Sequence, residues 1–138
     1  MNMYLSVIVI LYIFIMLNSI EVILKDDIKD IFNHFSNLFK IRIAFFSREG
    51  KELEVGMNLP CSAFCSFLRN QLGLLPKCLE TDRLKRNESA MEMKLIVYKC
   101  HAGLTEAILP VYANNTLLGF IMIGQIRSSN KIPMKNLY

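Results

Sequence analysis

The sequence predicts one α+β domain, built as an antiparallel sheet with helices on one side. Two observations predict this class. The chain has 138 residues and 53% apolar content, which is enough for one hydrophobic core, and its apolar residues recur first at helical and later at strand spacing. The net charge of +4 is spread along the chain, so the sequence has neither the strong charge of a disordered chain nor the basic stripe of a nucleic-acid-binding surface.

An uncharged segment opens the chain. Residues 1–20 contain no charged side chain, and the apolar run over residues 3–17 is intermediate in length between a signal-peptide core and a membrane span. Cleavage is not expected, because no basic residue precedes the run and no small-residue cleavage site follows it. Three interpretations of this segment stay open. Residues 3–24 could form a helix inserted in or lying on a membrane, the segment could be a buried helix or strand, or it could be translated from a misassigned start. Lys25 after the run favours a cytoplasmic position for the rest of the chain.

An amphipathic helix and a hairpin follow. Apolar residues at helical spacing indicate the helix and are expected to pack inward: Ile20, Leu24, Ile28, Ile31, Phe35 and Leu38. His34 lies on the polar side and is expected at the surface. Residues 41–46 are β-branched or aromatic, Gly50 can take the positive φ of a turn, and residues 51–55 can return as a second strand.

Two further helices are expected. Residues 60–72 predict a short helix that carries Cys61 and Cys65 on one face, because residues four apart are neighbours on a helix. A charged helix is expected over residues 76–93, with Pro76 near its first turn, where helices tolerate proline. Its run of charges is expected to be a solvated face.

The last third is rich in strands. Three strands are expected, paired antiparallel in chain order, over residues 95–100, 106–112 and 117–123. Asn114 and Asn115 suit the positive φ angles of a tight hairpin turn, and Pro110 should lie at an edge or bulge because it cannot donate a ladder hydrogen bond. This order of elements predicts a PAS-like or GAF-like cup, in which a ligand would lie between the sheet and the covering helices.

The four cysteines are the candidate chemistry-bearing residues: Cys61, Cys65, Cys78 and Cys100. Their spacing, C-x3-C-x12-C-x21-C, lacks the C-x2-C knuckle of zinc ribbons and fingers, and an apolar, loop-poor chain does not resemble a disulfide-stapled secreted domain. Free thiols are therefore expected. Two uses stay open for Cys65, Cys78 and Cys100: they could line a ligand site, or they could converge on a metal ion or an iron–sulfur cluster. Cys78 lies near a helix start, where the helix dipole stabilises a thiolate.

Catalytic motifs are missing from the sequence. Cys100 and His101 are adjacent, but consecutive strand residues point to opposite faces, which opposes a hydrogen bond between this Cys and this His. The chain carries no phosphate-binding loop, dinucleotide fingerprint, nucleophile elbow or zinc-protease helix. The protein is therefore expected not to be an enzyme.

Several short pieces match one known family. They are Phe39-Lys40-Ile41-Arg42-Ile43, Cys65 with Arg69, Cys78 with Asp82, Tyr98-Lys99-Cys100-His101-Ala102-Gly103-Leu104, Pro110, Gly119 and Gly124-Gln125. With these pieces in this order, residues 23–127 resemble the PocR sensory domain. The resemblance implies a PAS-related ligand sensor, commonly joined to an AraC-type DNA-binding region or to a histidine kinase. Carried over by position, the residues that would line or brace the ligand site are Cys65, Cys78, Tyr98, Cys100, His101 and Gln125.

The resemblance also implies an organisation and a role. An apolar segment over residues 1–22 would precede the sensory domain over residues 23–127, and a polar tail would follow over residues 128–138. Relatives continue into an output module, so a truncated gene product or pairing with another protein is expected. The expected function is non-catalytic binding of a small organic ligand, such as a small diol or hydrocarbon derivative, in transcriptional or two-component signalling. The alternatives are a Cys-ligated metal or iron–sulfur redox sensor and a structural module that forms a homodimer.

Overall fold

The computed structural model describes residues 26–127. Expectations for the apolar segment over residues 1–22, for the start of the first helix and for the tail over residues 128–138 lie outside the described residues. After a helix over residues 26–39, the elements are β1 (Arg42–Ser47), β2 (Glu52–Val55), η1 (Gly56–Asn58), α2 (Ala63–Asn70), α3 (Leu75–Glu92), β3 (Ile96–Lys99), β4 (Thr105–Ala113) and β5 (Thr116–Ile126). Within residues 26–127, no helix combines the length and the apolar character needed to cross a membrane.

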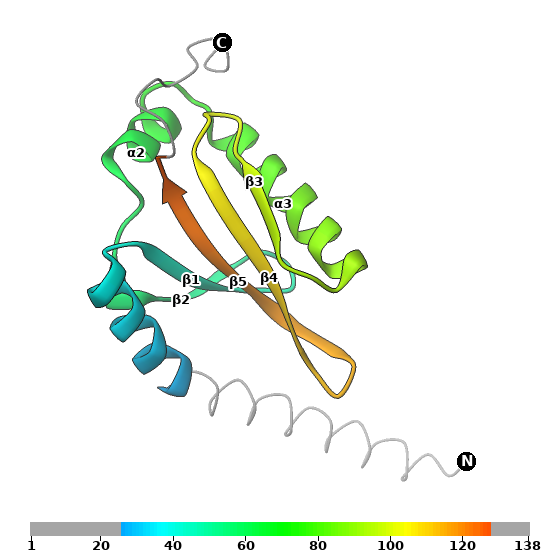
Figure 1. Ribbon diagram of the computed structural model, residues 1–138. Coiled ribbons are helices and arrows are strands. Elements are labelled where there is room, and N and C mark those ends of the chain that lie inside the picture. Colours follow the sequence, from blue (N-terminus) through cyan, green and yellow to red (C-terminus); the bar gives the residue numbers. More distant parts are fainter. Residues whose placement is uncertain (1–25, 128–138) are drawn as a thin grey trace, which may run out of the picture.

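One antiparallel sheet organises the domain (Figure 1). Its five strands lie in the order β2-β1-β5-β4-β3. Strands β1 and β2, β3 and β4, and β4 and β5 pair as chain neighbours, as predicted. The pairing of β1 with β5, from Arg42 opposite Gly124 to Ser47 opposite Gly119, joins the first hairpin to the last three strands. The predicted α+β class with an antiparallel sheet is confirmed.

The predicted turn and proline positions are also confirmed. Asn114 and Asn115 have φ of 48° and 63° in the turn between β4 and β5, the left-handed conformation that tight hairpins require. Strand β3 pairs only with Thr105–Ile108 of β4. No strand of residues 26–127 therefore lies on that side of β4 at Pro110, which is locally an edge position.

The helices divide between the two faces of the sheet instead of lying on one side. Phe32 of the first helix packs with Ile43 and Phe45 of β1 on one face. Ala90 of α3 packs on the other face, against a cluster that includes Ile108. Strand β5 is apolar on both faces, and this double-sided pattern is the sequence signal for a sheet that is covered on both sides.

The first helix buries a stripe that only partly matches the predicted one. Phe32 is 2% exposed, and Ile28 and Phe35 are partly buried beside it. Ile31 and Leu38, which were expected inward, are 63% and 74% exposed. The prediction is confirmed for Ile28 and Phe35 and wrong for Ile31 and Leu38, because apolar residues lie on both sides of the stripe that meets the sheet.

Helix α2 begins later than predicted. Its N-cap is Ser62, whose Oγ accepts a hydrogen bond from the backbone N–H of Cys65 at 3.1 Å. Cys61 therefore precedes the helix and does not share a helical face with Cys65, contrary to the expectation from their spacing. Leu68, 1% exposed, anchors the helix in the core.

Helix α3 is charged, yet it packs on the sheet. Lys77 and Arg83 are exposed, as expected of a solvated face, whereas Asp82 and Arg86 are half-buried. The Arg86 guanidinium lies over the turn between β1 and β2, where a Cβ added to Gly50 would come within 2.3 Å of Arg86 Nη2. Polar as well as apolar side chains therefore hold α3 to the sheet.

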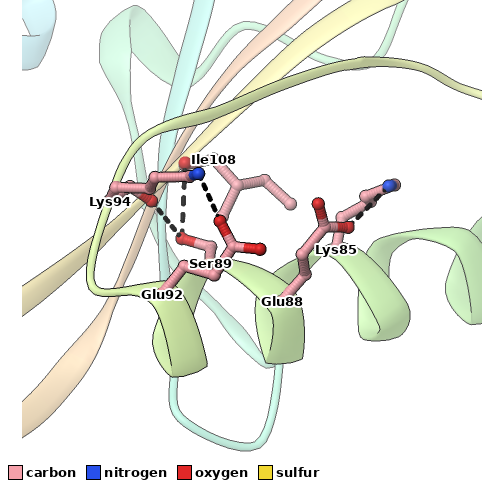
Figure 2. Close-up of polar contacts among 6 residues, drawn as sticks. All are labelled: Lys85, Glu88, Ser89, Glu92, Lys94 and Ile108. Atoms are coloured by element: carbon pink, nitrogen blue, oxygen red, sulfur yellow. Dashed lines mark hydrogen bonds and ion pairs between the residues drawn. The ribbon is translucent and has the colours of Figure 1, made fainter.

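The C-terminal end of α3 is fixed by a backbone cap and by Ser89 (Figure 2). The N–H of Lys94 donates to the Ser89 carbonyl at 3.3 Å and the N–H of Met93 donates to the Ala90 carbonyl at 3.4 Å, which are the paired contacts of a Schellman cap. The buried Ser89 hydroxyl donates to the Lys94 carbonyl at 3.0 Å and lies 3.5 Å from the Ile108 carbonyl of β4. The end of the helix is thus held against β4, and Met93 takes the left-handed φ of 51° that this cap requires.

This cap leads to a stability prediction. Met93→Gly should raise the free energy of unfolding by about 1 kcal/mol, because glycine adopts the left-handed conformation without the cost that a side chain brings. Met91 is 84% exposed in the last helical turn, and Met91→Gly should lower the free energy of unfolding by about 1 kcal/mol. Urea unfolding of both variants measures the difference. Midpoints that shift in the same direction would contradict the assigned cap.

Candidate functional site

A tight corner between β3 and β4 carries the Cys-His-Ala-Gly-Leu sequence. The N–H of Cys100 donates to the Leu104 carbonyl at 2.8 Å, and the N–H of Gly103 donates to the Cys100 carbonyl at 2.9 Å. Gly103 has φ of 84°, a conformation that residues with a Cβ rarely adopt. Ala102 and Leu104 are buried, so the corner (residues 100–104) is anchored in the core and holds its histidine in a fixed place.

A thiol of α3 meets that histidine. Cys78 Sγ lies 3.1 Å from His101 Nε2. Burial lowers the pKa of His101, and the charge of Lys77 lowers it further, so the imidazole is neutral at pH 7 and can accept a proton. The expectation that Cys100 would not be the hydrogen-bond partner of His101 agrees with this contact. The Cys–His pair is made instead by a cysteine that lies 23 residues earlier in the chain.

Three polar side chains, two of them buried and Asp82 half-buried, form a second group, here called the carboxyl cluster (Asp82, Tyr98 and Glu106). Tyr98 Oη lies 3.1 Å from Asp82 Oδ1 and 2.8 Å from Glu106 Oε2. Tyr98 is 8% exposed and Glu106 is 9% exposed. Burial raises the pKa of Asp82. Burial and, after it, the Asp82 charge raise the pKa of Glu106.

The geometry of the carboxyl cluster favours a shared proton. Burial, followed by the charges of Glu106 and Asp82, raises the pKa of Tyr98, so its hydroxyl keeps its hydrogen. That single hydrogen can be donated to one carboxylate at a time, whereas two carboxyl oxygens lie within hydrogen-bond distance. Both contacts are hydrogen bonds together only when one carboxyl group is protonated and donates to the Tyr98 oxygen. The raised pKa values of both acids favour that state.

The thiols gather around Arg69 and the carboxyl cluster. Cys65 is buried, whereas Cys61, Cys78 and Cys100 are half-buried. Burial raises the pKa of Cys65 and of Cys100. Arg69 of α2 is close enough to interact electrostatically with Cys61, Cys65 and Cys78. Its Nε atom is buried and has no hydrogen-bond acceptor within residues 26–127, and the same holds for His101 Nδ1.

No metal site is evident in this part of the chain. Among residues 26–127, no three His, Cys, Asp or Glu side chains are grouped so that they could hold a metal ion. The metal or iron–sulfur alternative for Cys65, Cys78 and Cys100 stays a prediction that this arrangement does not support.

The Gly-Gln piece at the end of β5 fits between α2 and the carboxyl cluster. Gln125 Oε1 accepts a hydrogen bond from the N–H of Ser62 at 2.6 Å, which ties β5 to the N-cap of α2. Gly124 faces Glu106, and a Cβ at this position would lie 2.7 Å from Glu106 Cγ. Gly124 therefore makes room for the buried carboxyl group, and Gln125 braces the N-cap of α2.

The structure places the six predicted site residues around one end of the sheet in unequal roles. Cys78 contacts His101, and Tyr98 lies between two acids. Cys65 and Cys100 both lie within electrostatic range of Glu106. Glu106 was missed as a site residue, although the alternation of β4 places it on the same buried face as Ile108 and Pro110. The sequence signal that could have identified Glu106 is its position two residues before Ile108, on the face of the strand that is otherwise apolar.

Comparisons with known proteins agree on one family. Residues 21–137 match the family described as the sensory domain found in PocR. Among curated proteins, the chain is similar to the Regulatory protein PocR of Salmonella typhimurium (strain LT2), with 27% identity over 110 residues. The match covers 80% of this chain and 36% of that relative, so the chain spans little more than a third of the relative's length. No solved structure matches the chain.

The carboxyl cluster predicts a pH-dependent stability. Because the pKa of Glu106 and that of Asp82 are raised in the folded chain, their contribution is complete below the unfolded pKa values of about 4 and is lost as the pH rises through the folded values. The free energy of unfolding should therefore fall as the pH is raised from about 4.5. Glu106→Gln keeps an acceptor for Tyr98 but cannot ionise, so its unfolding free energy should fall less.

Urea unfolding across this pH range measures the effect. Glu54→Gln on β2 is the control, and its pH profile should run parallel to that of the wild type. Parallel profiles for Glu106→Gln and wild type would show that Glu106 is ionised alike in the folded and unfolded chain, contrary to the prediction.

Proposed function

The chain belongs to the PocR sensory-domain family, and from this premise we propose that residues 26–127 bind a small organic molecule and pass its presence to a regulatory output. The sensory role follows from the family. The ligand and the signalling route are proposals. Binding of this kind needs no chemical conversion of the ligand, so the proposed role is non-catalytic.

Two buried donors support the ligand proposal. His101 Nδ1 and Arg69 Nε are buried and have no acceptor within the described residues. When Nε2 of the neutral imidazole accepts the proton of the Cys78 thiol, the imidazole hydrogen lies on Nδ1, which then needs an acceptor of its own. Leaving a buried donor unpaired costs about 1–3 kcal/mol. A ligand hydroxyl or carbonyl oxygen would recover that free energy, which favours small molecules with at least one oxygen, such as diols.

Binding at this place would act on the corner (residues 100–104). Strand β3 has four residues and lies at the edge of the sheet, so it depends on one neighbouring strand. A ligand held by His101 and Arg69 would link β3 to α2 and α3 and would order the end of β3. We propose that this ordering is the signal.

The proposed regulatory output would come from a region outside the part of the relative that matches this chain. The chain spans 36% of the Regulatory protein PocR, and an AraC-type DNA-binding region or a histidine kinase is the output that the resemblance implies. We propose that the chain signals through such a unit, either in the same polypeptide or in a partner protein.

A homodimer is a second proposal, and an exposed apolar edge favours it. Ile31 and Leu38 of the first helix are 63% and 74% exposed, and they lie seven residues apart, which places them on one side of the helix. Light scattering of Leu38→Glu against wild type would show whether this edge holds two copies together.

Ligand binding can be tested by thermal shift and calorimetry. A panel of short-chain diols and related alcohols should contain a compound that raises the melting temperature of the wild-type protein. His101→Asn and Arg69→Gln should each weaken binding of that compound about tenfold, which corresponds to about 1.4 kcal/mol for a lost hydrogen bond. His34 is exposed on the first helix, so His34→Asn should bind as the wild type does. Equal affinities for all of these proteins would place the ligand elsewhere.

A further inference from the structure

The contact between Cys78 and His101 has the geometry of an activated thiol. A nucleophilic sulfur is activated when a base lies within hydrogen-bond reach of it, and His101 Nε2 lies 3.1 Å from Cys78 Sγ. The thiol is half-buried, so small reagents can reach it. Sensing of a small organic molecule does not require this arrangement, because a ligand could be held without a reactive sulfur.

A second thiol, Cys100, directly follows β3 and packs against the same apolar cluster as Ala90 of α3. Helix α3 runs antiparallel to β3, since Ala90 packs in the cluster of Ile96 while Asp82 contacts Tyr98. From Asp82, four residues back along the helix lead to Cys78, a step of about 6 Å. From Tyr98, two residues lead past the end of β3 at Lys99 to Cys100, a step of about 6.7 Å if the backbone stays extended.

The two steps are similar in length, so Cys78 and Cys100 are expected near the same level of this interface. Cys100 belongs to the apolar cluster beneath α3, as Tyr98 does, and the charge of Cys78 acts on Cys100. Cys65 is the next thiol in range of Cys100, but it is buried.

We propose that Cys78 is a site of oxidation by hydroperoxides, with His101 as the base, and that oxidation ends in a disulfide between Cys78 and Cys100. In the first step the thiol proton passes to His101 Nε2, and the sulfur attacks one peroxide oxygen. The S–O bond forms, the O–O bond breaks, and the leaving oxygen takes the proton from the imidazolium as water. Cys78 is left as a sulfenic acid, oxidised by two electrons.

The second step uses the Cys100 thiol. The Cys100 sulfur attacks the Cys78 sulfur, the S–S bond forms, and the S–O bond breaks. The hydroxyl group leaves with the Cys100 proton as water. Two thiols and one hydrogen peroxide thus give one disulfide and two waters.

The surroundings of Cys78 are compatible with this chemistry. The charged and titratable groups around the pair come from three elements: Arg69 of α2, Lys77 and Asp82 of α3, and Cys100 and His101 of the corner. Arg69 and Lys77 carry positive charge, and Asp82 is an acid. A disulfide here would join the first turn of α3 to the corner after β3, next to the Cys78–His101 contact.

The experiment exposes the full 138-residue chain to hydrogen peroxide without any added ligand, so that its outcome does not depend on the proposed sensing function. Free thiols are then blocked, and mass spectrometry of peptides prepared without reductant maps the bonds. The expected product is the Cys78–Cys100 disulfide. In Cys100→Ser, dimedone should label Cys78 as a sulfenic acid. His101→Asn should slow the oxidation of Cys78 at pH 7 at least about tenfold, since general bases contribute factors of this size or more.

Two controls separate this role from a structural one. The oxidation rate of Cys61 should be unchanged in His101→Asn, and the wild-type rate at Cys78 should show a pH inflection that His101→Asn lacks. The wild-type mapping needs no substitution, so it decides the matter even if a variant fails to fold. A disulfide that joins another pair, or a Cys78 that oxidises no faster than Cys61, would overturn the proposal.

Discussion

The packing of a charged helix against an apolar sheet is the constraint on which this domain depends. Helix α3 meets β3 and β4 through the Tyr98 hydroxyl, which lies between Asp82 of the helix and Glu106 of β4. An ionised carboxylate is costly to bury without a partner, so the raised pKa values of both acids favour a state in which they keep one proton and share one hydroxyl. Because a hydrogen bond tolerates little change in distance, the shared hydroxyl helps to set the position of α3 along β3. The placement of Cys78 opposite the corner follows from that position.

The short motifs around the cluster serve this packing before they serve any ligand. Gly124 leaves the space that Glu106 fills, and Gln125 caps the backbone ahead of α2. Gly103 permits the tight corner that brings His101 to Cys78. The glycines and the glutamine of these motifs therefore have structural roles. The reactive atoms are the sulfur and nitrogen atoms that these residues help to bring together.

Local patterns predicted the elements of the fold, and contacts between distant residues explain what those patterns missed. Strand alternation and the Asn114-Asn115 turn are local, so the strands and their hairpins were predicted well. The stripe of the first helix was misplaced because Ile31 and Phe32 are equally apolar, and only the sheet decides which one is buried. The charged run of α3 was expected to be a solvated face. The sequence shows the charge of Asp82 but not the Tyr98 hydroxyl that lies beside it in the fold. The family resemblance named the site residues, but pairing Cys78 with His101 required the fold.

His101 connects the two activities proposed for this domain through its two nitrogens. Nε2 meets the Cys78 thiol, and Nδ1 is a buried donor with no acceptor in residues 26–127. An acceptor at one nitrogen of an imidazole makes the other nitrogen more basic, as carboxylate partners do for metal-binding histidines. A ligand oxygen at Nδ1 would therefore strengthen His101 as a base toward Cys78. Linkage makes this effect reciprocal. If a ligand at Nδ1 changes the free energy of the Cys78–Nε2 contact, the loss of that contact would change the free energy of ligand binding by the same amount. Sensing of a small molecule and sensitivity to oxidants would then be coupled through one side chain, with no need for a longer pathway across the fold.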